Sequence, residues 1–233
     1  MKAPCSLLRL ACATLTFCWI AVTPATGQPA PSPGGSSVAA QDLLSGFAEE
    51  WAGVGAYTAT VTVFERKDAR VQNMVLNYSF RKPASATALV TAGANSGSIL
   101  AWDGGTTVVV QLRGSGFLSL FKRRLSLHDP MATTIRGSSI DELSFPAILA
   151  HAQQEAGTLS TTPEAAIDGV ATDTVTLIPA TAEAGAGLTR EVVELSSATH
   201  LPMRVLGYDG PTLVLSLDFS NVTVEGASAV AKR

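Results

Sequence analysis

Side chains able to perform acid–base or nucleophilic chemistry are sparse in this chain of 233 residues, which has only three histidines. His128 precedes Asp129 and is the only histidine with an acidic neighbour. We interpret this pair as part of a turn, because adjacency alone does not make a catalytic pair. An enzyme that acts on lipids, such as a hydrolase, would need His128 or His151 to meet a serine and an acid in space.

Sequence motifs of catalytic and cofactor sites do not support that alternative. The chain lacks HExxH, GxSxG, a phosphate-binding loop, GxGxxG and a calcium-binding loop. The formal charge of −3 argues against nucleic acid, which requires a broad basic surface. We therefore predict a protein that is not an enzyme, has no catalytic residues, metal or cofactor, and does not bind nucleic acid.

The N-terminal segment predicts export. Residues 1–27 have the layout of a signal peptide, with the basic residues Lys2 and Arg9 before the apolar run Leu10–Val22. That run is too short to span a bilayer comfortably, although an uncleaved membrane anchor is the alternative. Ala25-Thr26-Gly27 supplies the small residues of a cleavage site.

All three cysteines, Cys5, Cys12 and Cys18, lie in this segment. The mature chain would therefore have no disulfide, zinc–thiolate site or catalytic thiol, which favours a bacterial envelope protein in the periplasm. Residues 28–37 have the composition of a flexible linker. Residues 38–233 remain for a single domain.

A long hairpin over Tyr57–Pro83 organises the predicted domain. Apolar and polar residues alternate along its second strand, so that one face is apolar and the other is mostly wet. Short strands with tight turns continue to Leu112, and five further strands are expected at Gly157–Thr162, Gly169–Ile178, Leu188–Ser196, Pro202–Tyr208 and Thr212–Val224.

Helical periodicity predicts a first helix over Val38–Ala52 and a second helical region over Ser139–Ala156, with Pro146 in its first turn. The first helix either packs on the sheet only or also closes one end of a cavity. Between the two sets of strands, Arg113–Pro130 is expected to form a loop or short helix. This stretch is either an ordinary turn with solvated charges or a mobile flap that meets a lipid or an acidic partner.

These elements predict a mostly β (α+β) fold. We expect a curved, incomplete antiparallel β-barrel of about ten to eleven strands, with helices as a lid on its concave face.

Several short motifs, in their order along the chain, resemble the LolA-type outer-membrane lipoprotein carriers and the related LolB- and RseB-like proteins. They are Leu76–Pro83 (LNYSFRKP), the Asp103-Gly104-Gly105-Thr106 turn within Ser98–Val110, His200-Leu201-Pro202-Met203-Arg204 and the closing strand Thr212–Val224. Gly105 stands where the family often has lysine. The stretch from Leu127 to Gln154 looks closer to an uncharacterised branch of that superfamily.

This resemblance implies helices that cover an apolar cavity, and binding of lipoprotein acyl chains, of related lipids, or of a signal in a periplasmic sensor. It places Arg81 at the cavity mouth, as the nearest match to a functional arginine of the family. The inner faces of the predicted strands supply the expected cavity wall: Met74, Leu76, Tyr78, Phe80, Trp102, Leu213, Leu215, Leu217 and Phe219. The expected lid consists of Leu43, Phe47, Trp51, Phe117 and Phe121.

We therefore predict a monomeric periplasmic protein that holds lipoprotein acyl chains or related lipids for transport between envelope membranes. An envelope membrane protein is a further candidate partner. The alternative is a periplasmic sensor or scaffold that uses the same fold to bind a protein and transfers no lipid.

Overall fold

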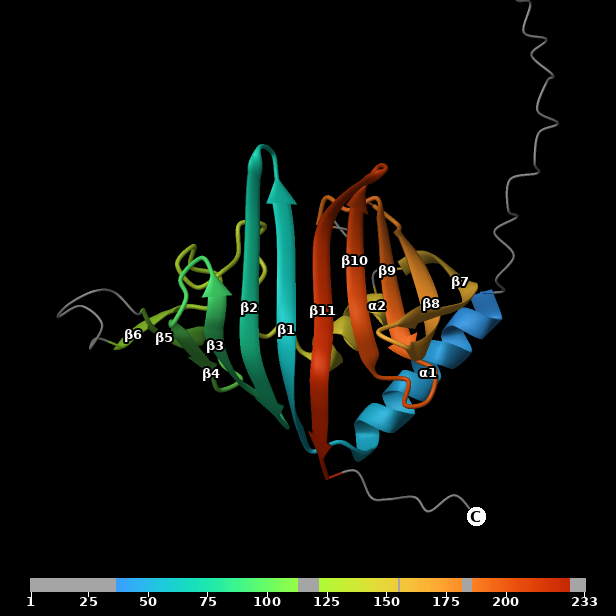
Figure 1. Cartoon of the computed structure of the whole chain (residues 1–233), viewed down its shortest axis with the longest axis horizontal. Helices are drawn as coiled ribbons and strands as arrows, with labels where there is room; N and C mark the ends of the chain where they lie inside the picture. The colour runs from blue at the N-terminus through green and yellow to red at the C-terminus, as the bar shows by residue number, and fades with distance from the viewer. Residues whose placement is uncertain (1–36, 113–121, 155, 182–185, 227–233) are drawn as a thin grey trace, which may run out of the picture. The chain divides into compact units, whose positions relative to one another are not determined.

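The computed structural model describes residues 37–112, 122–154, 156–181 and 186–226. Within these ranges, one antiparallel sheet of eleven strands and two helices form the fold (Figure 1). The predicted signal peptide, the linker up to residue 36 and the predicted lid residues Phe117 and Phe121 lie outside the described residues.

The first half of the sheet is a meander that begins with the predicted hairpin. Its strands β1 (Ala56–Lys67) and β2 (Arg70–Arg81) are joined by a turn in which Asp68 takes a positive φ of 55°. The meander continues through β3 (Ser85–Gly93), β4 (Ile99–Trp102), β5 (Thr107–Gln111) and β6 (Lys122–Ser126).

Strand β6 corrects one prediction. Lys122, Arg123 and Arg124 were expected in a loop or short helix, but they extend along β5, with Val109 opposite Arg124. Pairing with β5 satisfies the backbone groups on one side of this segment. Three consecutive basic residues give no alternation of hydrophobicity, so the sequence pattern did not reveal the strand.

The second half of the sheet follows helix α2 (Phe145–Gln154), whose first turn contains Pro146 as predicted. The helix is shorter than the predicted region Ser139–Ala156: it starts after Ser144, whose hydroxyl accepts from the Ala147 N–H at 3.3 Å, and Ala156 already belongs to a strand. Its strands occupy the five predicted positions to within a few residues. They are β7 (Ala156–Ile167), β8 (Val170–Pro179), β9 (Arg190–Ser196), β10 (Pro202–Asp209) and β11 (Thr212–Glu225).

The two meanders are joined where the first strand pairs with the last. β1 lies beside β11, with Val61 opposite Phe219 and Val63 opposite Leu217. The strand order is β6-β5-β4-β3-β2-β1-β11-β10-β9-β8-β7, so β6 and β7 are two unjoined edges. The predicted curved, incomplete barrel is confirmed.

Both helices lie on the same side of the sheet as its buried side chains. Helix α2 runs behind the central strands in the view of Figure 1, and α1 (Ser37–Gly53) lies beside β7 and β8. Phe47 and Trp51 of α1 pack edge-on against Phe145, at ring-centroid distances of 6.3 and 6.2 Å. Within the described part of the chain, neither helix is both long and apolar enough to cross a membrane.

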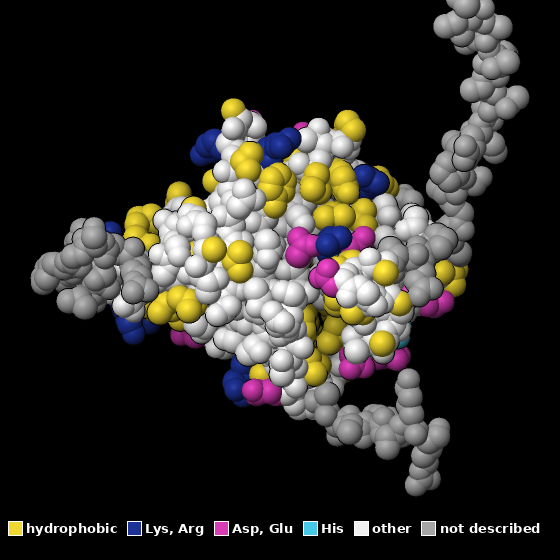
Figure 2. All heavy atoms as spheres, viewed as in Figure 1, with side chains coloured by type: hydrophobic (Ala, Val, Ile, Leu, Met, Phe, Trp, Pro, Cys, Tyr) yellow, Lys and Arg dark blue, Asp and Glu magenta, His cyan; other side chains and the backbone are white. Residues whose placement is uncertain are grey.

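The face of the sheet opposite α2 carries a polar group in its second half. Arg204 on β10 lies between Glu194 of β9, at 3.5 Å, and Asp218 of β11, to which its Nε donates a hydrogen bond. Desolvation raises the pKa of Glu194, and the neighbouring guanidinium of Arg204 opposes that shift. Figure 2 shows charged side chains gathered on this face, below a group of hydrophobic ones.

Candidate functional site

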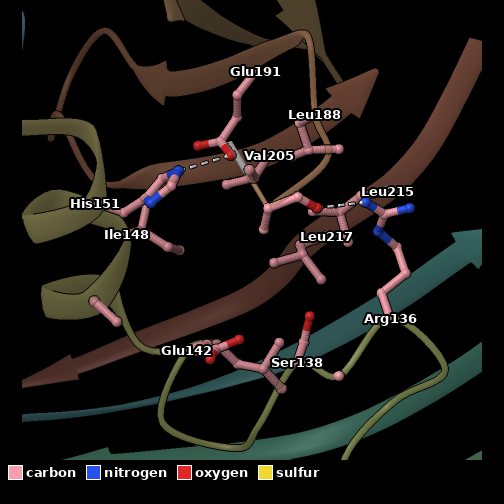
Figure 3. A pocket seen from close by; sticks show the side chains of 14 residues that line it. Arg136, Ser138, Glu142, Ile148, His151, Leu188, Glu191, Val205, Leu215 and Leu217 are labelled. Atoms are coloured by element: carbon pink, nitrogen blue, oxygen red, sulfur yellow. Dashed lines mark hydrogen bonds and ion pairs between the residues drawn. The ribbon is translucent and has the colours of Figure 1, made fainter. Parts of the chain in front are cut away.

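An open cavity of about 420 Å³ lies between α2, the turn before it and the concave face of β9–β11 (Figure 3). Its wall consists of Arg136, Gly137, Ser138, Glu142, Leu143, Ala147, Ile148, His151, Ala186, Leu188, Glu191, Val205, Leu215 and Leu217. The floor belongs to the last strands of the chain, and the opposite wall to α2 and the residues before it.

Aliphatic side chains form the floor. Val205 of β10 pairs with Leu217 of β11, and both side chains point to the cavity because both lie on the concave face (Figure 3). Two residues beyond Val205 on β10, Gly207 leaves room for the side chain of Leu188. A Cβ atom at position 207 would lie only 2.9–3.0 Å from the two methyl carbons of Leu188. The missing side chain at position 207 therefore admits Leu188 to the floor.

Helix α2 supplies the facing wall. Ala147, Ile148 and His151 line the cavity at a spacing that places them on one side of the helix. Ala147 is small and only half-buried, which leaves the cavity open at this position.

The rim of the cavity is polar. His151 Nε2 lies 3.2 Å from Glu191 Oε2, so that α2 and β9 are linked across one end of the cavity (Figure 3). The side chain of Glu191 is 7% exposed. Glu142 stands at the opposite rim, where desolvation raises the pKa of its carboxyl and the nearby Ser139 N–H, 3.4 Å from Oε2, works against that shift.

A guanidinium group closes another part of the rim. Arg136 donates to the carbonyl oxygen of Arg66 at 3.1 Å and to that of Ala186 at 3.2 Å. It therefore connects the end of β1 with the chain before β9, and its charge stands at the rim above the aliphatic floor. The cavity is thus apolar at its floor and carries charges and hydrogen-bonding groups at its rim. This arrangement suits an amphiphile whose apolar part lies on the floor.

The first half of the concave face is filled instead. A pocket of only about 60 Å³ remains there, and Met74 and Leu76 of β2 are part of its wall. Next to it, aromatic rings occupy the space: Tyr57 stacks on Phe145 at 4.1 Å, and Tyr78 lies 6.0 Å from Tyr57. The Tyr57 hydroxyl accepts a hydrogen bond from the Phe145 N–H, and the Tyr78 hydroxyl donates to the Ile140 carbonyl.

The predicted cavity residues are therefore divided among three places. Leu215 and Leu217 line the 420 Å³ cavity, whereas Met74 and Leu76 line the small pocket. The remaining predicted residues line neither hollow. Of the predicted cavity wall, Tyr78, Phe80 and Phe219 lie in the buried core, and Trp102 and Leu213 are half-buried on β4 and β11. Of the predicted lid, Phe47 and Trp51 of α1 are buried, and Leu43 is half-buried beside them.

Arg81 is likewise away from the 420 Å³ cavity. Its guanidinium is 3.6 Å from Glu225, and the two side chains are 72% and 64% exposed. Arg81 pairs with Ala56 at the end of β2, far along the strand from Met74 and its neighbours. The structure thus gives this residue a surface ion pair and no contact with either hollow.

Several residues of the cavity wall were missed by the sequence reasoning, notably Ile148, His151, Leu188, Glu191 and Val205. Ile148 and His151 had a usable signal, because they share one side of a predicted helix. Glu191 and Leu188 had none, since a glutamate in a short strand and a leucine beside a loop are ordinary. Among the described residues, no group of three or more His, Cys, Asp or Glu is placed to hold a metal ion.

Comparison with known proteins identifies the architecture. No family model matches the chain, and no curated protein sequence matches it. Among solved structures, an uncharacterized conserved protein from Thermus thermophilus aligns with a TM-score of 0.50 and 11% identity, over 82% of this chain and 90% of that one. At this identity, the two proteins share a fold.

Two further solved structures are similar at lower TM-scores. The lipoprotein LppX of Mycobacterium tuberculosis has a TM-score of 0.49 and 15% identity, over 82% of this chain and all of that one. A LolA superfamily protein from Nitrosomonas europaea has a TM-score of 0.37 and 12% identity, over 80% of this chain and 93% of that one. At such identities the likeness concerns the fold alone.

Proposed function

We propose that this protein is a periplasmic binding protein that holds acyl chains of lipoproteins or related lipids for transport between envelope membranes. The observation that carries the proposal is the cavity of about 420 Å³ with an aliphatic floor and a polar rim. Its volume falls within the roughly 300–1,000 Å³ that is usual for small-molecule sites. The proposal assigns no catalytic role to the rim residues.

The expected binding energy comes from burial of methylene groups. Each methylene moved from water to an apolar site contributes about 0.8 kcal/mol, so a chain that reaches Val205, Leu217 and Ile148 gains useful affinity. His151, Glu142 and Arg136 at the rim can meet a polar headgroup, which keeps the charged end of the ligand near water.

The proposal is tested by blocking the cavity from the helix side. Ala147→Trp places an indole in the cavity, whereas the control Gln153→Trp adds the same group to an exposed position of α2. Binding of dansyl-labelled undecanoic acid is measured by fluorescence for both variants and the unmodified protein. We expect Ala147→Trp to weaken binding at least tenfold and Gln153→Trp to change it less than twofold.

Native mass spectrometry of protein purified from an envelope fraction, followed by lipid extraction, would then identify the natural ligand class. Acylated species bound in near-stoichiometric amount are the expected result. A ligand-free mass together with no uptake of the dansyl probe would contradict the proposal.

A protein-binding role is the second candidate, and edge strand β6 favours it. Lys122, Arg123 and Arg124 on this strand are exposed, and one side of β6 has no neighbouring strand in the described part of the sheet. An acidic, extended segment of a partner could pair there by strand addition. Failure of the lipid tests, together with binding of an acidic protein that is lost in an Arg123→Glu/Arg124→Glu variant, would support the sensor or scaffold.

A further inference from the structure

The 420 Å³ cavity and the 60 Å³ pocket are neighbours with a common wall. Ser138 and Leu143 line both of them. The chain between residues 134 and 143 therefore stands as a partition on the concave face. Beyond it, Thr133 and Ile140 contribute to the small pocket only, and Arg136 and Glu142 to the large cavity only.

The partition begins with a closed turn over residues 134–138. The Thr134 N–H donates to the Ser138 carbonyl at 3.0 Å, and the Gly137 N–H donates to the Thr134 carbonyl at 3.0 Å. The Ser138 N–H donates to the Thr134 hydroxyl, also at 3.0 Å. Gly137 has a φ of +97°, which other residues rarely adopt, so the turn depends on glycine at this position.

Glu65 of β1 holds this turn against the sheet through two hydrogen bonds, which we call the clasp. Its side chain lies on the concave face with 0% exposure, and both oxygens are used. Oε1 accepts from the Thr134 hydroxyl at 2.7 Å, and Oε2 accepts from the Arg136 N–H at 2.9 Å. A buried carboxylate is costly unless such bonds satisfy it, so the clasp and the burial of Glu65 depend on one another.

A second strand adds to the clasp. Gln72 of β2 is the cross-strand partner of Glu65, and its Oε1 accepts from the Ile135 N–H at 2.8 Å. Residues 134, 135 and 136 are thus each fixed to β1 or β2. The aliphatic floor begins one strand further on, because Glu65 is also the cross-strand partner of Leu215.

We propose that this clasped turn limits the site to one apolar chain, so that the protein selects single-chain amphiphiles over lipids with two or three chains. The inference rests on the function proposed above and narrows its ligands from lipoproteins and related lipids to lipids that present a single chain. The cavity of about 420 Å³ lies near the lower end of the roughly 300–1,000 Å³ that is usual for small-molecule sites, which favours one chain over three. Release of the turn from Glu65 would remove part of the wall between the small pocket and the cavity.

The test compares three probes on the unmodified full chain: dansyl-labelled undecanoic acid, a diacyl phosphatidylethanolamine and a tripalmitoylated cysteinyl lipopeptide. We expect the single-chain probe to bind at least tenfold more tightly than the triacyl probe. Thr134→Val removes the bond to Glu65 and the acceptor of the Ser138 N–H with little change in shape. Thr133→Val is the matched control because Thr133 bonds to the Asp129 carbonyl instead. Glu65→Gln is a second variant in case either valine variant is unstable.

Thr134→Val and Glu65→Gln should reduce the preference for the single chain at least fivefold. They should also speed hydrogen exchange at the Arg136 amide, which is bonded to Glu65, and Thr133→Val should do neither. Equal affinity of the unmodified protein for the single-chain and triacyl probes would overturn the inference but leave the proposed function standing. If the variants kept the same preference for the single-chain probe although amide hydrogens of the turn exchanged faster, the clasp would have no role in that preference. Failure to bind any of the three probes would instead refute the proposed function.

Discussion

The concave face is filled over β1–β3 and hollow over β9–β11, although the strands on both sides alternate between apolar and polar residues. On the filled side, large rings stack on one another, and the turn clasped by Glu65 covers what remains. On the hollow side, smaller aliphatic residues form the floor, and α2 presents an alanine at position 147. Side-chain size, rather than strand pattern, therefore decides where this sheet can hold a ligand.

Helix α2 belongs to both regions. Its first residue, Phe145, is fully buried and contacts Tyr57, Trp51 and Phe219 on the filled side. Two and three residues later, Ala147 and Ile148 face the cavity. The start of the helix is thus anchored by aromatic packing, which holds the next turn over an opening that its own side chains do not fill.

The largest effect is expected at that anchor. Phe145→Ala should lower the free energy of unfolding by about 3–5 kcal/mol, because it leaves a cavity among rings that cannot collapse into it. Urea unfolding followed by tryptophan fluorescence measures the change. A loss below about 1 kcal/mol would show that the filled region is loosely packed and would remove the contrast between the two regions.

Leu217 is the matching probe on the hollow side. Leu217→Ala should cost about 2 kcal/mol, at the low end for such a change, because part of this side chain already faces empty space. The same urea titration, run beside that of Phe145→Ala, measures the difference. If Leu217→Ala were as costly as Phe145→Ala, the cavity would have to be closed in solution.

A smaller effect, dependent on pH, is expected from the two buried tyrosines. Burial raises the pKa of Tyr57 and that of Tyr78 above the ordinary value for a phenol. The unfolded chain ionises near pH 10, so the stability that the neutral phenols provide is complete below that pH and is lost as pH rises further. By pH 11 the loss should be about 1 kcal/mol for each phenol.

Urea titrations between pH 8 and 11 measure this loss. A Tyr57→Phe/Tyr78→Phe variant should show a shallower decline than the unmodified protein, since it has no buried phenol to ionise. Tyr208→Phe, on a half-buried residue of β10, is the control. Identical slopes for the double variant and the unmodified protein would mean that water reaches the filled region.

The smallest effect is expected at Arg81. Its ion pair with Glu225 is largely exposed, and such pairs contribute about 0–1 kcal/mol. Arg81→Ala should therefore leave stability within about 0.5 kcal/mol and leave binding of dansyl-labelled undecanoic acid unchanged. A tenfold loss of binding would restore Arg81 to the mouth of the site, as the family resemblance implied.

Local pattern predicted much of this architecture and part of the candidate site. Alternation in β2 separated Met74, Leu76, Tyr78 and Phe80 from their solvent-facing neighbours, and all four are buried. The same reasoning could not tell that Leu76 would face a small pocket and Tyr78 a ring stack. Both outcomes depend on what the opposite wall supplies. Residues 134–144 of that wall form turns, for which neither the expected loop nor the expected helical region gave a position.

The sequence by itself determined the positions of both helices and of ten strands, because hydrophobic period is a local property that survives in the folded chain. Only the tertiary structure decided that β1 pairs with β11, that Glu65 binds a turn some seventy residues away, and that the hollow lies over β9–β11. Those features arise from contacts between distant segments and from the volumes of facing side chains. The spacing of residues along one strand predicts neither these contacts nor these volumes.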